Sequence, residues 1–507
     1  MLSAEKRSTR TIRPPSLLDS LIPLATLIVL LALSVGLYGV DATLGPLQVA
    51  LFMATVVGAV VAVKNGHSWE EIGTAIVQGI STAMSAIFIL LMVGALIGVW
   101  NMSGTIATIV YAGIEFLEAS WFYIAAALVT GVVGLATGSS WTTAATIGVA
   151  LVSIARVMGV SPEITAGAVI SGAYFGDKMT PISETTILVP QLVGSNVPLH
   201  IRSMMRSTIP AFLLALLGFL VMGLTGATAA PPIDKQAALD ALSSVYAISL
   251  WTLIPVVVLL ILSFRRFPAF MAILIGTLVG GLVAVVLQPE LVLAFVNDPT
   301  LSTPLAMLKG VWSAMATGFT LDSGFPAIDT LFSGGGMSSM LYTVWLILGA
   351  MAFGAITEYA QFSRRLIDPL LVRARSAGAL IASVMATAIG LNIFAGDQYV
   401  AIILPARMFL LEFKRRGLHP ENLATAVENS GTVTSPLVPW NSCGAYMTSA
   451  LGVSTFLYFP YCFFNFLNPI LGAIFGYTGR GILRLSPEEA AALPAEVPTA
   501  PPAPLVK

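Results

Sequence analysis

The hydrophobic pattern of the chain consists of long apolar stretches with few charges. The first of them, residues 21–40, contains no charged side chain. A helix of about 20 apolar residues is long enough to cross the hydrocarbon core of a bilayer. Similar stretches recur throughout, so we predict an all-α polytopic membrane protein with roughly 11–14 membrane segments. The further candidate spans are 45–63, 84–100, 119–136, 140–158, 207–225, 246–263, 268–288, 341–357, 379–395, 398–412, 437–452 and 456–476.

Composition strengthens this prediction and excludes some partners. The chain is 57% hydrophobic and only 10% charged, whereas about 25% of an ordinary soluble domain is charged. The formal net charge is −1, so no overall field would recruit nucleic acid. We expect the lipid bilayer as a partner and no nucleic acid, and a homo-oligomeric state is left open.

Basic residues in the connections set the expected orientation, because cytoplasmic loops are rich in Lys and Arg. Residues 226–245 and 289–340 contain no arginine, so we place them outside the cell. The long second connection could fold over the outer mouth or be a passive link. We expect a multi-pass protein of the bacterial plasma (inner) membrane, with the N-terminus and the C-terminus in the cytoplasm. The basic segments are 6–13, 195–206, 264–267, 362–376, 414–416 and 480–484.

Two segments of the chain resemble each other at a constant offset. The sequences "ATGSSWTTA" and "FAGDQYVAI" share a glycine, two polar residues and an aromatic, and Gly138 and Gly396 are 258 residues apart. The same offset relates "AGAV" at Ala166 to "ATAV" at Ala424. Basic loops of one half correspond to sparsely charged loops of the other, so the copies should be inverted across the membrane. Inverted repeats with interrupted helices are typical of secondary transporters.

The repeat divides the chain into six predicted parts. Residues 479–507 are rich in Pro and Ala, which predicts a disordered tail. The parts are a cytoplasmic N-terminal segment (1–18), N-terminal membrane helices and their connection (19–83), the first repeat (84–225), linking helices and an outer loop (226–340), the second, inverted repeat (341–478) and the cytoplasmic tail (479–507).

Polar side chains gather where these apolar segments are interrupted, as in "GAYFGDKMTPISETT" and "ENSGTVTSPLVPWNS". Glycine and proline would end helices inside the membrane as broken helices or re-entrant hairpins, and freed backbone groups there must line a cavity or be covered by protein. The predicted helix breakers are Gly138, Gly176, Pro181, Gly396, Gly431 and Pro436. The predicted transport site comprises Asp177, Thr180, Ser183, Glu184, Thr185, Asp397, Glu428 and Ser435, supported by Ser139, Ser140, Thr142, Lys178 and Asn441.

A carboxylate is costly inside a bilayer and therefore usually serves a function there. If it holds either a proton or Na⁺ but not both, it provides the simplest chemistry for exchange. Lys178 could instead balance a charge or hold a substrate anion, and Arg407 is expected to reach towards the cytoplasm. We expect Trp141 and Tyr399 to be packing residues.

The other reactive side chains do not favour an enzyme. Cys443 and Cys462 lie in apolar surroundings and are expected to be buried thiols, and the three histidines lie in polar connections. There is no HExxH motif, Cys/His cluster or phosphate-binding glycine loop in the sequence. We expect no cofactor, only transported Na⁺ and H⁺.

The segments "LATGSSWTTAATIGVAL", "AGAVISGAYFGDKMTPISETT", "HIRSMMRSTIP" and "SGTVTSPLVPWNSCG" resemble the NhaC-type sodium/proton antiporters over residues 94–475. The resemblance implies cation-coupled antiport with inverted repeats and broken helices. The family commonly has Ser where Thr180 stands and Asp where Glu184 stands, and the longer Glu184 could alter ion selectivity. Some relatives couple ions to organic acids or amino acids.

Three other functions therefore stay open beside Na⁺/H⁺ antiport. One is a Na⁺- or H⁺-coupled exchanger of a small carboxylate or amino acid, such as malate or lactate, in which freed helix amides and Lys178 would hold the substrate. A channel is another, although isolated carboxylates at broken helices suit stepwise exchange better. A remote alternative is an intramembrane aspartyl protease that uses Asp177 and Asp397.

Overall fold

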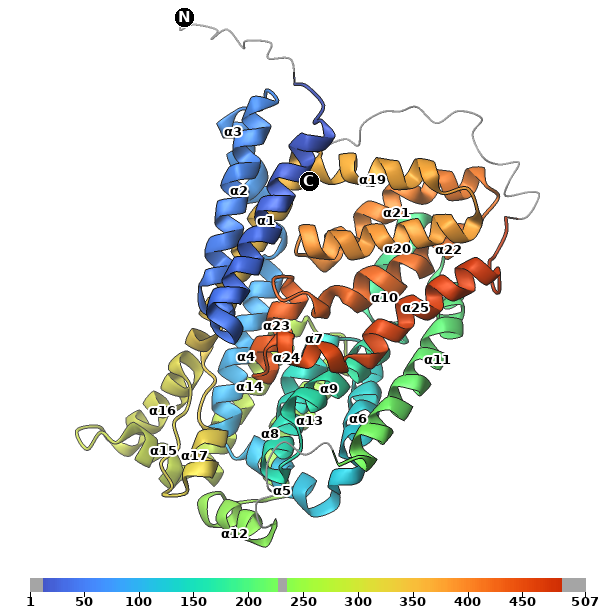
Figure 1. Ribbon diagram of the computed structural model, residues 1–507. Coiled ribbons are helices and arrows are strands. Elements are labelled where there is room, and N and C mark those ends of the chain that lie inside the picture. Colours follow the sequence, from blue (N-terminus) through green and yellow to red (C-terminus); the bar gives the residue numbers. More distant parts are fainter. Residues whose placement is uncertain (1–11, 227–234, 486–507) are drawn as a thin grey trace, which may run out of the picture.

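The computed structural model describes residues 12–226 and 235–485, and these are folded almost entirely as helices (Figure 1). The described residues contain only two isolated β-bridges and no longer strand. The basic residues at 6–10 and residues 486–507 of the predicted tail lie outside this part of the chain. The first residues of the predicted tail, 479–485, are described, and the Leu485 amide donates to the Gly417 carbonyl (3.0 Å). The prediction of an all-α polytopic membrane protein is confirmed for the part described.

The helices of the first half begin with an N-terminal group and continue into the first repeat. The helices are α1 (Leu17–Tyr38), α2 (Pro46–Lys64), α3 (Trp69–Thr82), α4 (Met84–Met102), α5 (Thr105–Phe116), α6 (Phe122–Thr137), α7 (Ser140–Thr143), α8 (Val149–Met158), α9 (Pro162–Lys178), α10 (Glu184–Val193) and α11 (Val197–Leu224). A π-helical turn, Ala144–Gly148, joins α7 to α8, so that the helix runs on from Ser140 to Met158.

The linking region and the second repeat supply the remaining helices. They are α12 (Lys235–Val245), α13 (Ile254–Phe264), α14 (Ala269–Leu287), α15 (Pro289–Val296), α16 (Thr303–Thr317), α17 (Pro326–Phe332), α18 (Leu341–Tyr359), α19 (Phe362–Arg373), α20 (Ala377–Phe394), α21 (Gln398–Arg415), α22 (Pro420–Val427), α23 (Ser442–Leu451), α24 (Thr455–Tyr458) and α25 (Phe463–Thr478). A π-helical turn, Glu428–Thr432, extends α22.

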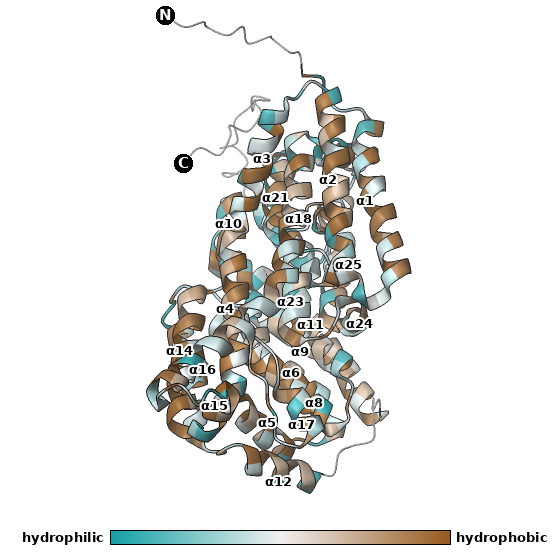
Figure 2. Ribbon diagram, turned by 90° about the vertical axis from the view of Figure 1, so that its left-hand side faces the viewer, coloured by the Kyte–Doolittle hydropathy of each residue, from teal (hydrophilic) through white to brown (hydrophobic). Residues whose placement is uncertain are grey.

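Nine helices among the described residues are long and apolar enough to cross a membrane, or up to eleven if each of two bent pairs counts as one span. Hydrophobic residues predominate along α1 and α2, for example (Figure 2). Two predicted spans do not qualify by length and composition. The one at 398–412 belongs to α21, whose later turns carry charged side chains, and in 437–452 the α-helix begins only at Ser442.

The region 289–340, expected as a long outer loop, contains the three helices α15, α16 and α17. It returns to the membrane helices through close backbone contact, because the Gly336 amide donates to the Gly94 carbonyl of α4 (2.6 Å). A side chain at Gly98 would collide with the Ala314 carbonyl of α16 at 2.3 Å. The segment therefore packs against α4 rather than hanging as a free loop.

The offset of 258 residues seen in the sequence also relates elements of the structure. Glycines with positive φ end helices at corresponding positions, and N-capping side chains begin helices at corresponding positions. The glycine pairs are Gly138 and Gly396, Gly159 and Gly417, and Gly194 and Gly452, and the N-cap pairs are Ser139 and Asp397, Ser161 and His419, and Ser183 and Asn441. The two copies thus share helix boundaries, while their inversion across the bilayer stays a prediction from loop charge.

Each copy contains two interruptions, a hairpin turn and a break in the next helix. In the first copy α6 turns into α7 at Gly138, and residues 179–183 separate α9 from α10. In the second copy α20 turns into α21 at Gly396, and residues 438–441 precede α23. Pro181 lies within one break, and Pro436 lies in the short 3₁₀ turn before the other.

Two of the predicted helix breakers do not end a helix. Gly176 lies inside α9, which continues to Lys178, and Gly431 lies within the π-helical turn that prolongs α22. Close packing explains both glycines. A Cβ at Gly176 would lie 2.4 Å from the Gly131 carbonyl oxygen of α6, and one at Gly431 would lie 3.0 Å from that of Ala401.

A substitution at the contact between α6 and α9 tests whether close packing requires glycine there. At Gly172 an added Cβ would lie 2.2 Å from the carbonyl oxygen of Ala127. We expect Gly172→Ala to force the two helices apart and to destabilise the protein by about 1–3 kcal/mol. Thermal unfolding of the purified protein measures the effect, and Gly36→Ala, where no atom lies within 4 Å of the new methyl group, is the control. Equal stability of the two variants would contradict the close packing.

Candidate functional site

A cavity of about 400 Å³ lies where the interrupted helices of the two copies meet. Its wall contains the first residues of four helices, α7, α10, α21 and α23, together with parts of the α3–α4 junction and the end of α13. Two helices come from each copy. The cavity is therefore at the interface of the repeats, where a secondary transporter is expected to bind its substrate.

Asp177 is the buried carboxylate that the first copy contributes to this cavity. It lies in the last turn of α9 and is 9% exposed. The Ser140 backbone amide, at the start of α7, donates to its Oδ2 over 3.0 Å. The hairpin turn and the broken helix are thus joined through this one side chain, which still contributes to the cavity wall.

Asp397 is the buried carboxylate that the second copy contributes to the cavity, and it is 8% exposed. As the N-cap of α21, its Oδ1 accepts hydrogen bonds from the amides of Tyr399 (2.8 Å) and Val400 (3.1 Å). Its Oδ2 accepts one from the Ser442 hydroxyl (3.3 Å) at the start of α23. The Ser442 amide also donates to the Gly396 carbonyl (2.8 Å), so here too the hairpin turn is fixed to the broken helix.

The helix termini determine the electrostatics of the cavity. A helix N-terminus carries unpaired amide groups and a partial positive charge, and it favours nearby anions. With four such ends in its wall, the cavity favours negatively charged groups. The backbone groups that these breaks leave free towards the cavity include the amino ends of four helices.

Asp177 and Asp397 do not occupy equivalent positions in the two copies. The residue 258 positions after Asp177 is Ser435, and the residue 258 positions before Asp397 is Ser139. Each copy therefore places a carboxylate where the other copy places a serine. Asp177 follows a helix, whereas Asp397 caps the start of one, so the two side chains have different backbone surroundings.

The structure brings many of the predicted site residues into one wall and leaves others outside it. Glu184 is exposed in the wall, and Ser183 and Thr185 are buried in it. The predicted residues in the wall are Gly138, Ser139, Ser140, Thr142, Asp177, Ser183, Glu184, Thr185 and Asp397. Those outside it are Gly176, Lys178, Thr180, Pro181, Gly396, Glu428, Gly431, Ser435, Pro436 and Asn441.

Three of the residues outside the wall support it from behind. The Ser435 hydroxyl donates to Oε1 of Gln398, which does line the cavity (2.8 Å). Asn441 caps α23 by accepting the Cys443 amide (3.0 Å). The Thr180 carbonyl accepts the Ser183 amide across the α9–α10 break (3.4 Å).

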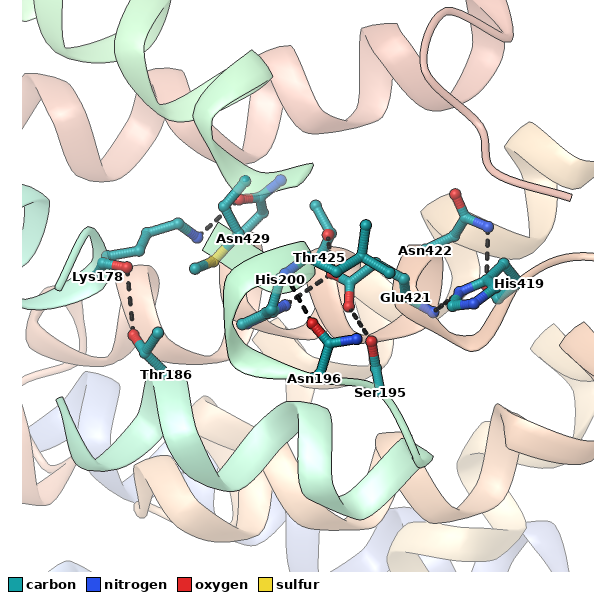
Figure 3. Close-up of polar contacts among 12 residues, drawn as sticks. Lys178, Thr186, Ser195, Asn196, His200, His419, Glu421, Asn422, Thr425 and Asn429 are labelled. Carbon is teal, nitrogen blue, oxygen red and sulfur yellow. Dashed lines mark hydrogen bonds and ion pairs between the residues drawn. The ribbon is translucent and has the colours of Figure 1, made fainter. Parts of the chain in front are cut away.

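Lys178 and Glu428 are fully buried behind the cavity. The Lys178 ammonium donates to Oδ1 of Asn429 (2.7 Å; Figure 3), and within residues 12–226 and 235–485 it forms no ion pair. Glu428 is fully buried, like Lys178 (1% exposed). Neither oxygen of Glu428 has a hydrogen-bond partner among the described residues. Lys178 is thus not paired directly with its neighbour Asp177.

Several residues of the wall were not predicted as site residues. Trp141 and Tyr399, expected to be packing residues, both line the cavity, and Trp141 stacks on Tyr446 with ring centroids 4.0 Å apart. The signal was present in the sequence, because both are the aromatic residue of the repeated motif. Gln398, Cys443 and Arg266 line the cavity as well. Cys443 and Cys462 are both buried free thiols.

The donor set does not resemble a site for a bound transition metal. Among the described residues no group of three or more His, Cys, Asp or Glu side chains is placed to hold a metal ion. The wall contains hydroxyl and carboxylate oxygens, such as those of Ser139, Thr142 and Asp177, and oxygen atoms are the ligands that hard cations prefer.

Two repeats, interrupted helices and a polar cavity between them define this chain as a membrane transporter. Comparison with family models then identifies it more closely: residues 1–202 and 172–480 match the Na⁺/H⁺ antiporter family. The chain belongs to that family, as the resemblance to NhaC-type proteins had implied.

Individual relatives are similar over most of their length. The Na⁺/H⁺ antiporter NhaC of Alkalihalophilus pseudofirmus is 35% identical over 437 residues, which cover 86% of this chain and 90% of the relative. The malate-2H⁺/Na⁺-lactate antiporter of Bacillus subtilis is 33% identical over 441 residues, with 86% and 90% coverage. The arginine/ornithine antiporter ArcD of Halobacterium salinarum is 32% identical over 498 residues, with 96% and 98% coverage.

The two roles of Asp397, as a helix cap and as a charge in the cavity, can be separated by substitution. Asparagine caps helices about as well as aspartate, and alanine does not. We expect Asp397→Ala to lower stability by about 0.5–2 kcal/mol, and Asp397→Asn to leave it nearly unchanged. Thermal unfolding in detergent measures the difference, and equal destabilisation by both substitutions would contradict the capping role.

Proposed function

We propose that this protein exchanges Na⁺ for H⁺ across the bacterial plasma membrane, and that the transported ions bind at Asp177 and Asp397. The observation that supports this most strongly is the pair of buried carboxylates in one cavity between the repeats. The membership of the chain in the Na⁺/H⁺ antiporter family agrees with this proposal. Hydroxyl groups of the wall, such as those of Ser139 and Thr142, would complete the oxygen ligands of Na⁺.

Exchange follows from competition for the same oxygens. When Asp177 is ionised, its negative charge attracts Na⁺, and when its oxygen forms an O–H bond that attraction is lost. The partial positive charge of the helix N-termini in the wall lowers the cost of the ionised form. The hydrogen bond from the Ser140 amide holds the carboxylate at the hairpin turn, so movement of the hairpin would move the ion site with it.

The cavity should open to the cytoplasm in this conformation. Ser263 and Arg266 contribute to its wall, and they belong to the end of α13 and the basic connection 264–267. Because basic connections stay on the cytoplasmic side, we place this mouth of the cavity inside the cell. Both termini are placed in the cytoplasm on the same grounds.

A second candidate is the coupled exchange of a small carboxylate or an amino acid. About 10–15 Å³ holds one water molecule, so a cavity of about 400 Å³ is much larger than a single Na⁺ requires. Arg266 and the amino ends of four helices could bind a substrate carboxylate. The names of the malate/lactate and arginine/ornithine relatives make these the substrates to test.

Asp177→Asn tests the proposed exchange directly. In inverted membrane vesicles that hold a proton gradient, added Na⁺ should dissipate the gradient with the wild-type protein. The variant should reduce this response to background, because an amide cannot alternate between Na⁺ and a proton. Asp298→Asn is a matched control, since Asp298 is remote in sequence and pairs with Lys309 in an exposed region.

Three outcomes separate the candidates. If the Asp177→Asn variant dissipates the proton gradient on addition of Na⁺ as the wild-type protein does, Asp177 is not part of the mechanism. Flux of malate, lactate, arginine or ornithine, with no Na⁺/H⁺ exchange in their absence, would favour the second candidate. Cleavage of a reporter peptide that either aspartate substitution abolishes would instead support the intramembrane protease.

A further inference from the structure

A second, smaller cavity of about 60 Å³ lies between α11 of the first repeat and α20, α22 and α25 of the second. It shares no lining residue with the larger cavity. Arg206 and Arg480 line it, and both are exposed, so they lie where the cavity meets the surface. They belong to the basic segments 195–206 and 480–484, which we place on the cytoplasmic side.

Hydrogen bonds hold the backbone on both sides of this cavity in place. The segment that carries Arg480 is fixed to α22, because the Leu483 amide donates to Oδ1 of Asn422 (2.9 Å) and the Asn422 side-chain amide donates to the Leu483 carbonyl (2.7 Å). Across the cavity, Nη1 of Arg206 donates to the Gly481 carbonyl over 2.7 Å. The two arginines therefore belong to one preformed site.

The positive charges of this site are not balanced by acidic side chains within residues 12–226 and 235–485, where neither Arg206 nor Arg480 forms an ion pair. Glu421 of α22 is engaged elsewhere, with Nδ1 of His200 2.8 Å from its Oε1 and the Ser195 hydroxyl donating to its Oε2 over 2.6 Å (Figure 3). His200 was expected in a polar connection, but it is fully buried in the first turn of α11. Since an arginine has five N–H donors, the two side chains offer donors for an anion.

The surface beside the cavity is apolar and belongs to helices of the membrane. On α11, the exposed Ile209 and Leu213 follow Arg206 at intervals of three and four residues, which places them on the same side of this spanning helix. On α25, the exposed Tyr477 lies three residues before Arg480. Tyrosine is enriched at the level of the lipid headgroups. The arginines thus lie at the boundary between hydrocarbon and water.

The chemistry of this boundary site matches a lipid phosphate. Arginine binds phosphate through parallel N–H···O bonds. The cavity has room for about four water molecules, and a phosphate group has four oxygen atoms of about that size. Ser203 lines the cavity as well and can donate a further hydrogen bond. Basic pockets between membrane helices on the cytoplasmic side are known to take anionic headgroups.

We propose that this cavity binds the headgroup phosphate of an anionic phospholipid of the cytoplasmic leaflet through Arg206 and Arg480, with an acyl chain along Ile209 and Leu213. The site is separate from the proposed ion exchange and does not depend on it. Because α11 belongs to the first repeat and α25 to the second, a headgroup bound to both arginines joins the two repeats at their cytoplasmic ends.

Lipid binding to the purified protein tests this site without measuring transport. Native mass spectrometry of the protein in detergent gives the dissociation constant of the first bound dioleoyl phosphatidylglycerol. Replacing both arginines, Arg206→Gln with Arg480→Gln, should weaken this binding by roughly thirtyfold. Arg364→Gln with Arg365→Gln removes the same charge from exposed positions of α19 that do not line the cavity, and it should stay within about twofold of wild type.

Two further ligands identify what the site recognises. Dioleoyl phosphatidylcholine, which carries the same phosphate and chains but no net charge, should bind the wild-type protein more weakly than phosphatidylglycerol. Inorganic phosphate, which has no acyl chain, should leave phosphatidylglycerol bound. Equal affinity for the two lipids, or displacement of the lipid by inorganic phosphate, would overturn the assignment to an anionic phospholipid.

A loss of phosphatidylglycerol binding confined to the Arg206 and Arg480 variant would support the site. Unchanged binding in that variant, or an equal loss in the α19 control, would overturn it, since the effect would then be one of surface charge alone. Ser203→Glu decides the question if the arginine variant does not fold. It places a carboxylate in the wall one turn from Arg206 and should weaken binding by at least about tenfold, whereas unchanged binding would overturn the site.

Discussion

The hydrogen bond from the Ser140 amide to Asp177 shows the constraint on which the rest of the site depends. Inside a membrane, each interrupted helix must find partners for the backbone groups that it leaves free. Here the partners are side chains at the breaks: Ser139 and Ser183 cap helices in one copy, and Asp397 and Asn441 cap helices in the other. The cavity is formed because these capped ends converge. The residues that stabilise the helix ends are therefore also residues at the cavity in which we propose ion binding.

The differences between the two copies make the site asymmetric. A strict repeat would place two identical groups around the cavity. Instead, Asp177 corresponds to Ser435 in the second copy, and Asp397 corresponds to Ser139 in the first. Behind the wall the difference continues, since only the first copy has Lys178 and only the second has Glu428 at this level. The first copy therefore places a buried carboxylate, Asp177, next in sequence to a buried ammonium, Lys178, and the second copy does not.

The sequence predicted features that depend on local chemistry. Gly138 and Gly396 were identified as breaks, and at both the backbone has a positive φ that favours glycine. Gly176 and Gly431 were predicted as breaks too, yet they lie within helical turns and allow close helix contact. A sequence alone does not distinguish a glycine that ends a helix from one that allows close packing. Asp177 and Asp397 were found because a membrane carboxylate is rare.

Contacts between distant residues could not be predicted in this way. Lys178 and Asn429 are 251 residues apart, and His200 and Glu421 are 221 apart. No periodicity or motif relates the members of either pair, so the sequence predicted for Lys178 a charge-balancing or substrate-binding role without naming Asn429 as its partner. Both contacts became visible only in the folded chain.

The most direct test of the central claim is the release of protons when Na⁺ is added to purified protein in weakly buffered detergent solution, followed with a pH-sensitive dye. If Na⁺ binding at Asp177 displaces a proton, the wild-type protein releases protons on addition of Na⁺ but not of a large organic cation such as choline. The Asp177→Asn variant then shows no release. Equal release from the variant, or none from the wild-type protein, would contradict the claim that this cavity couples Na⁺ to H⁺.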